Sequence, residues 1–184
     1  MAIEEPKYTV ESSTPDYEIR KYPPILVAET LVEGDFDSAG GQAFRVLADY
    51  IFGNNKAKTK IAMTAPVSQQ SSSEKIAMTA PVSQQKKGSF FLVQFTMPGE
   101  YTMKTIPEPV DPRVVLREIP QRRVAVHSYS GTWSEGRYQE KLAFLREALR
   151  REGIDGLGEA TFARYNSPYQ LWFLRRNEIW LQLP

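Results

Sequence analysis

The chain has 184 residues, of which 41% are hydrophobic and 24% are charged, and its formal net charge is +1. These values are typical of a soluble protein with one domain over residues 1–184, and they give no electrostatic support to nucleic-acid binding. The absence of cysteine excludes disulfides, thiolate metal sites and cysteine nucleophiles.

Neither a membrane span nor a secretion signal is expected. No apolar run reaches the length of about 18 residues that a spanning helix needs. The segment MAIEEPKYTVESS has acidic residues where a signal peptide needs a basic region and an apolar core. We therefore expect a cytoplasmic protein.

Short runs rich in β-branched and aromatic residues predict strands along the chain, because each is bounded by Pro, Gly, Asn or Asp. They lie at residues 17–22, 25–33, 89–97, 122–130, 159–165 and 177–183. The Pro-rich stretch at 106–112 predicts an extended crossover instead.

Two segments have the periodicity of helices. One apolar stripe runs over residues 36–51 and the other over residues 138–149, and a glycine follows each. Thr132 and Glu135 have the spacing of a capping box, which predicts that the second helix begins there.

The segment KIAMTAPVSQQ occurs twice, at residues 60–70 and again, 15 residues later, at residues 75–85. Two copies are too few for a stacked repeat protein. Each copy combines residues suited to a pleated surface with a proline suited to an edge or a bulge. We interpret the pair as a hairpin with Met63 and Met78 on one face.

A fainter repeat has an offset of 97 residues, and in both places a strand runs into Gly, one residue, an aromatic side chain and a helix. The matched positions are Val27-Ala28, Gly34 and Phe36 in the first half and Val124-Ala125, Gly131 and Trp133 in the second. This pattern predicts two halves related by a pseudo-twofold axis, with both helices on a shared curved sheet. A groove at the seam would suit a ligand.

The chain has one histidine, His127, in a predicted strand. One histidine is too few for a zinc site, and no acidic residue near it in sequence completes a catalytic triad. One imidazole is sufficient as an axial haem ligand. The alternative is a strand histidine that faces solvent or is hydrogen-bonded.

The last predicted strand begins with Arg175, Arg176, Asn177 and Glu178. Adjacent arginines in a regular strand point to opposite faces, so at most one enters a pocket. Glu178 shares a face with Trp180, where a carboxylate is costly unless it is paired. This predicts either an internal salt bridge or a site for a cationic ligand.

Large aromatic residues concentrate near the C-terminus, at Phe162, Tyr165, Tyr169, Trp172, Phe173 and Trp180. With Met63, Met78 and the first helix they suit a planar ligand, and they equally suit a core. No nucleophile elbow, phosphate-binding loop, dinucleotide turn or HExxH motif occurs, which favours a binding protein over an enzyme.

Together these motifs resemble the SOUL haem-binding proteins, over about Tyr8 to Leu183. The resemblance rests on KIAMTAPV after a helix ending in YIFG, on FTMP, on DPRV followed by LREIP, on SGTWSE, and on ARYNSP followed by WFLRRNEIWL. The doubled KIAMTAPV is similar to bacterial members. The resemblance implies an α+β fold, a twisted, distorted antiparallel β-barrel of two pseudo-symmetric halves flanked by two helices, as in GyrI-like domains.

The resemblance also implies a function, because members of this family bind haem and other tetrapyrroles in an apolar cleft beside the first helix. In this chain the resemblance implies a cleft lined by Phe44, Leu47, Ala48, Ile51, Met63 and the loop residues Tyr169, Trp172 and Phe173. Met78 and Glu178 are further candidate ligand-binding residues from the sequence patterns above, and His127 is a candidate metal ligand. Animal members have basic residues for the haem propionates on the first helix and in the late loop. The matching positions here are Asp49 and Gln170.

We therefore expect a non-enzymatic haem or tetrapyrrole carrier or buffer, a monomer with no nucleic-acid or membrane partner. The first alternative is a freestanding GyrI-like sensor that binds planar cationic molecules through Glu178. A hydrolase built on the same cleft is a third option.

Overall fold

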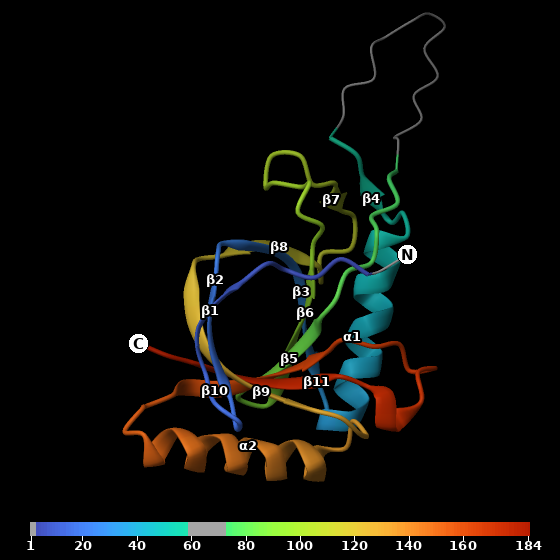
Figure 1. The fold of residues 1–184 in the computed structure, drawn as a ribbon. Coiled ribbons are helices and arrows are strands. Elements are labelled where there is room, and N and C mark those ends of the chain that lie inside the picture. The colour runs from blue at the N-terminus through green and yellow to red at the C-terminus, as the bar shows by residue number, and fades with distance from the viewer. Residues whose placement is uncertain (1–2, 59–72) are drawn as a thin grey trace, which may run out of the picture.

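The computed structural model describes residues 3–58 and 73–184. In this part of the chain, nine strands form one antiparallel sheet that curls into an open barrel, with both helices on its outer side (Figure 1). The strand order is β1-β2-β9-β11-β10-β5-β6-β3-β8. The strands are β1 (Thr9–Ser13), β2 (Glu18–Tyr22), β3 (Ile25–Glu33), β5 (Val82–Lys87), β6 (Phe90–Thr96), β8 (Val115–Ile119), β9 (Arg122–Tyr129), β10 (Leu157–Arg164) and β11 (Asn177–Gln182).

The strand order confirms the predicted pseudo-twofold arrangement. From the centre outward, one half reads β5-β6-β3-β8 and the other reads β10-β11-β9-β2. In each half the chain passes from β3 or β9 through a helix to the two inner strands. The turns into the helices match as well, because Gly34 and Gly131 have φ of 139° and 123°, which side chains rarely adopt.

The two helices are α1 (Phe36–Ile51) and α2 (Glu135–Arg151), close to the predicted ranges. Asp35 caps α1 by accepting a hydrogen bond from the Ser38 N–H at 2.8 Å. The capping box predicted for α2 is wrong, because the cap is Ser134, whose hydroxyl accepts from the Arg137 N–H at 3.4 Å. A capping residue must directly precede the first helical residue, and Thr132 lies too early in the chain.

Each helix buries its apolar side against the outer face of the sheet. Leu47 and Ile51 of α1 are 0% and 1% exposed and pack with Val93 of β6. Leu145 of α2 is 0% exposed and packs with Ile179 of β11. Burial of one such side chain contributes about 2 kcal/mol. The inner face of the sheet therefore remains for other contacts.

The duplicated segment differs from its prediction. The first copy, which includes Met63, lies entirely outside the described residues, which leaves the predicted hairpin untested. In the second copy the predicted strand at Ile76 and Met78 is wrong, because the strand begins only at Val82. The backbone N–H of Ile76 donates to the Ile51 carbonyl at the end of α1 instead of to a neighbouring strand.

Two edge strands were not predicted. All residues of β1 are exposed and β8 is largely exposed, so neither has the apolar alternation that reveals a half-buried strand. Within the Pro-rich crossover, β7 (Glu108–Pro109) pairs with β4 (Asn55–Lys56).

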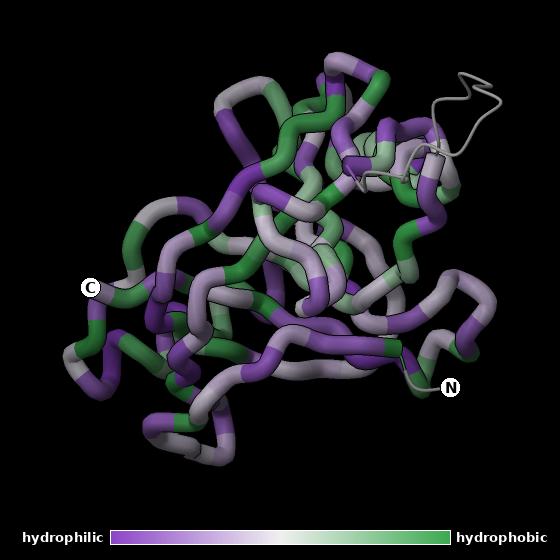
Figure 2. The backbone as a smooth tube through the Cα atoms, turned by 90° about the horizontal axis from the view of Figure 1, so that it is seen from above, coloured by the Kyte–Doolittle hydropathy of each residue, from purple (hydrophilic) through white to green (hydrophobic). Residues whose placement is uncertain are grey.

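Hydrophobic and hydrophilic residues alternate along much of the backbone (Figure 2). No helix in the described ranges is long and apolar enough to cross a membrane.

Candidate functional site

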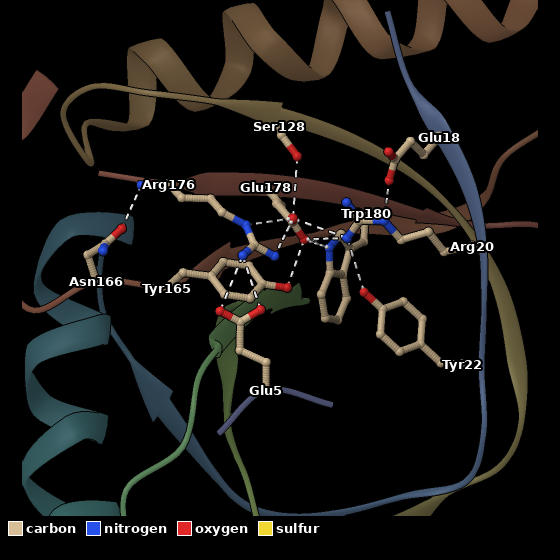
Figure 3. A network of polar contacts seen from close by, with 10 residues as sticks. All are labelled: Glu5, Glu18, Arg20, Tyr22, Ser128, Tyr165, Asn166, Arg176, Glu178 and Trp180. Carbon is tan, nitrogen blue, oxygen red and sulfur yellow. Dashed lines mark hydrogen bonds and ion pairs between the residues drawn. The ribbon is translucent and has the colours of Figure 1, made fainter. Parts of the chain in front are cut away.

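The carboxylate of Glu178 lies at the centre of a polar network on the inner face of the sheet (Figure 3). Its side chain is 0% exposed. Nη1 of Arg20 donates to both carboxylate oxygens at 3.1 Å, and Nε of Arg176 donates to Oε1 at 3.1 Å. Strands β2 and β11 supply Arg20 and Glu178, on either side of β9.

Neutral donors complete the network. The Tyr165 hydroxyl and Nε1 of Trp180 each donate to Oε2 of Glu178 at 2.8 Å, and the Ser128 hydroxyl donates to Oε1 at 3.3 Å. Burial alone raises the pKa of a carboxyl, but the Arg20 charge, these hydrogen bonds and Arg176 hold the pKa of Glu178 below its ordinary value. Glu178 therefore forms an internal salt bridge, one of the two predicted alternatives.

The two adjacent arginines diverge, as the strand pattern predicts. Arg176 enters the network, with its guanidinium 3.8 Å from the Tyr165 ring. Arg175 lies over the Trp133 ring, at 4.4 Å. The alternation of β2 was the sequence signal for Arg20, since it places Arg20 on one face with Glu18 and Tyr22.

The surface exposes a run of large apolar side chains at residues 169–174, here called the aromatic loop. Tyr169 is 96% exposed, Trp172 57% and Phe173 52%. The Trp172 and Phe173 rings meet edge to face, with centroids 5.6 Å apart. Leu171 and Leu174 are also more than half exposed. Such a contiguous exposed apolar patch is typical of an interaction site.

Two arginines and Trp133 connect the aromatic loop to α1. Arg175 donates to the Gln170 carbonyl at 2.9 Å and to the Pro168 carbonyl at 2.8 Å, which fixes the start of the loop. The Arg164 guanidinium also lies over the Trp133 ring, at 5.1 Å. Arg164 packs so closely on α1 that a Cβ added at Gly40 would lie 2.9 Å from its Nη1.

Arg164 is a partly buried cation with few partners. It donates one hydrogen bond to Gln84 at 3.3 Å, and within the described residues no carboxylate forms an ion pair with it. Burial lowers the pKa of Arg164 to about 10. Phe44 lies one helical turn after Gly40, on the same side of α1, and is 37% exposed.

The structure gathers only some of the residues that the resemblance implied. Tyr169, Trp172 and Phe173 share the aromatic loop, and Phe44 lies on the side of α1 that faces Arg164. In contrast, Leu47, Ala48 and Ile51 are buried. Met78 is 38% exposed, Met63 is outside the described residues, and Glu178 lies within the barrel.

The C-terminal aromatic residues divide among three environments. Phe162 is 0% exposed in the core between the helices, where its ring stacks on Phe36. Tyr165 and Trp180 hydrogen-bond to Glu178 inside the barrel. The remaining ones form the aromatic loop.

His127 lies on the side of the sheet that α2 covers. Its Nδ1 is 2.7 Å from the Asp16 carbonyl oxygen, so Nδ1 carries the proton and donates. The ring lies against Phe144 of α2, with centroids 4.9 Å apart. Across the described residues, no three His, Cys, Asp or Glu side chains form a group suited to a metal ion.

Solved structures show the class of fold to which this scaffold belongs. The chain is 10% identical to the EcmrR C-terminal domain, with a TM-score of 0.63 over 96% of this chain and 98% of that one. A structure described as a hydrolase from Listeria innocua matches at 10% identity, with a TM-score of 0.59 over 95% and 94%. SAV2435 bound to tetraphenylphosphonium matches at 10% identity, with a TM-score of 0.52 over 92% and 94%. The fold is thus shared with GyrI-like proteins.

Sequence similarity is more specific. The sequence profile of the SOUL heme-binding protein family matches residues 3–74 and 68–182, and the chain belongs to this family. It is 34% identical to Heme-binding protein 2 of Mus musculus and of Homo sapiens, over 90% of this chain and 77% of each relative. Each profile match contains one complete copy of KIAMTAPVSQQ. This indicates that the chain has one copy more than the family pattern.

Proposed function

We propose that this protein binds haem or a related tetrapyrrole and acts as a carrier or buffer rather than an enzyme. Membership of the SOUL family supports this function, as do two relatives named Heme-binding protein 2. Bound haem supplies a redox-active iron. The role of the protein is to cover the apolar macrocycle and to pair the propionate carboxylates with cationic side chains.

The observation that carries the proposal is the exposed aromatic loop. Trp172 and Phe173 offer large flat side chains, more than half exposed, to a planar apolar ligand. Tyr169, 96% exposed, extends this surface, and Phe44 on α1 is 37% exposed. Leu47 and Ile51 act indirectly, because their burial holds α1 against the sheet.

Two cations suit the propionates of such a ligand. The guanidinium groups of Arg164 and Arg175 both stack on Trp133, beside the start of the aromatic loop. Arg164 has no carboxylate partner in the described residues, so a propionate would provide the charge-assisted partner that its burial favours. These arginines replace the basic residues of animal members at the positions of Asp49 and Gln170.

The residues fit the macrocycle and its carboxylates better than they fit an imidazole-ligated iron. His127 is the single histidine of the chain, and it already donates to the Asp16 carbonyl beneath α2. Affinity should therefore come mainly from burial of the macrocycle.

The geometry gives less support to the alternatives. A cationic ligand at Glu178 would have to displace the Arg20 and Arg176 guanidinium groups. A hydrolase would need a carboxyl that exchanges protons near neutral pH, and the pKa of Glu178 is lowered instead.

Titration with haemin tests the proposal. The Soret absorption should shift and saturate near one equivalent of haemin. The double variant Trp172→Ser/Phe173→Ser should weaken binding at least tenfold, whereas Phe90→Ser should leave it unchanged, because Phe90 is 42% exposed on a distant strand end. A response that never saturates, or equal affinity in all three proteins, would overturn the proposal.

A further inference from the structure

A second candidate site lies on the inner face of the barrel, separate from the aromatic loop. A cavity of about 390 Å³ opens between strands β5, β6, β8, β9, β10 and β11. Its volume is within the range of about 300–1,000 Å³ that small-molecule sites occupy. Trp180 forms one wall of this cavity, and Nε1 of the same side chain donates to Glu178.

The decisive residue in the cavity is Arg122, at the start of β9. Its guanidinium lies over the Trp180 ring, with 5.4 Å between the central carbon and the ring centroid. The Nε atom is buried and has no hydrogen-bond partner among the described residues. Burial lowers the pKa of Arg122, and no acidic group in the described ranges offsets this effect.

A partly buried guanidinium without a carboxylate partner is costly, because no counter-charge replaces the water that it has lost. Arg20 shows the contrast within the same barrel, since it is paired with Glu178 at 3.1 Å. Arg20 is satisfied by hydrogen bonds and ion pairs, whereas Arg122 lies on the face of the Trp180 ring. Arg122 therefore lacks the anion that Arg20 has.

Positive side chains outnumber negative ones around the cavity. Lys87, Arg117 and Arg122 line it together with one carboxylate, that of Glu159. Arg117 already pairs with Glu29 at 3.2 Å. Lys87 and Arg122 are therefore the cations that remain for a ligand.

We propose that this cavity binds a small organic carboxylate, with the carboxylate paired to Arg122 and the apolar part of the ligand against Trp180. Guanidinium and carboxylate match in a planar, two-bonded geometry. The apolar side chains of Ile119 and Leu157 also line the cavity, and inorganic phosphate would leave them uncovered. This cavity does not overlap the proposed haem site at the aromatic loop. It would select anions, whereas a barrel with a free Glu178 carboxylate would select cations.

A series of isosteric probes tests the charge preference. Benzoate is anionic, benzamide is neutral and benzamidine is cationic, and all three have nearly the same shape. In two-dimensional NMR spectra of the protein, benzoate should shift the indole N–H signal of Trp180 in a saturable way. Benzamide, benzamidine and inorganic phosphate should bind at least tenfold more weakly.

Variants locate the site. Arg122→Gln should weaken benzoate binding at least tenfold and leave the melting temperature unchanged or higher, because a partly buried charge without a carboxylate partner is removed. Arg150→Gln, at an exposed arginine on α2, should bind benzoate normally. If Arg122→Gln does not fold, Arg122→Lys should retain the preference for benzoate over benzamide.

Several results would overturn the proposal. These are equal binding of benzoate and benzamide, tighter binding of phosphate than of benzoate, or full benzoate affinity in Arg122→Gln. Haemin-saturated protein should bind benzoate as well as free protein does. Competition between them would assign the benzoate to the haem site and contradict the second site, whatever the outcome of the haemin titration alone.

Discussion

Nη1 of Arg20 lies 3.1 Å from both carboxylate oxygens of Glu178, although 158 residues separate the two in sequence. The contact crosses β9, which lies between β2 and β11 in the sheet. It therefore ties the N-terminal part of the chain to the last strand. Both side chains are almost completely buried, and each has one further ion pair, Arg20 with Glu18 and Glu178 with Arg176.

Glu178→Gln should lower the free energy of unfolding by about 3–5 kcal/mol, because it removes the buried carboxylate that Arg20 and Arg176 share and leaves Arg20 paired only with the partly exposed Glu18 at 2.7 Å. Urea unfolding followed by circular dichroism measures the change. Glu147→Gln is the matched control, since Glu147 pairs with Arg150 at 2.8 Å on the exposed face of α2. The control should change the free energy of unfolding far less, because water and salt screen an exposed ion pair. Equal effects of the two substitutions would contradict the structural role of Glu178.

The stability of the protein should depend on pH through the same carboxyl. The pKa of Glu178 is lower in the folded protein than its ordinary value of 4.5, so its contribution is fully present above pH 4.5 and is lost as the pH falls further. The free energy of unfolding of the wild type should therefore decrease as the pH is lowered below 4.5. Glu178→Gln should show a flatter dependence between neutral and acidic pH. If the free energy of unfolding had the same pH dependence in both proteins, Glu178 would not be the group that controls it.

Deletion of residues 60–74 should leave the fold intact. The product has one copy of KIAMTAPVSQQ, as the family profile has, and residues 56–59 would then join Asn55 to Lys75. The distance is short, because the Asn55 side chain bonds to the Glu74 backbone at 2.8 and 3.0 Å. Shortening the connection between Asn55 and Lys75 contributes about 1 kcal/mol in chain entropy. The melting temperature should therefore change by only a few degrees.

Its control is Ile76→Ala in the shortened chain. Ile76 is 2% exposed in the core beside α1, so truncation of this side chain should cost about 3 kcal/mol. If the shortened chain is unfolded before any substitution, the extra copy is required for folding and the prediction is wrong.

His127→Ala should retain haem affinity within tenfold, a change of about 1.4 kcal/mol. The imidazole donates to the Asp16 carbonyl and packs on Phe144, away from the aromatic loop. Haemin titration measures the affinity, and the absorption spectrum reports the coordination of the iron. A loss above a hundredfold, with a change in coordination number, would identify His127 as an axial ligand.

Local sequence patterns indicated both α-helices and most of the inner strands, but not the exposed edge strands β1 and β8. The strand predicted at 25–33 coincides with β3, and the apolar stripe over 36–51 coincides with α1. The repeat of Gly34 and Gly131 also indicated the two halves of the sheet. These features are local, because alternation, helical periodicity and glycine conformation each depend on residues near one another in the chain.

The tertiary structure alone decided which side chains meet. The pattern of α1 identified Leu47 and Ile51 as apolar, but their burial depends on how the sheet curls beneath the helix. Similarly, the sequence predicted that Glu178 needs a partner, and only the position of β9 between β2 and β11 provides Arg20. By contrast, the same fold places no acidic side chain of the described residues in an ion pair with Arg122. Charge pairing within a barrel depends on strand order and curvature, which bring together residues distant in sequence.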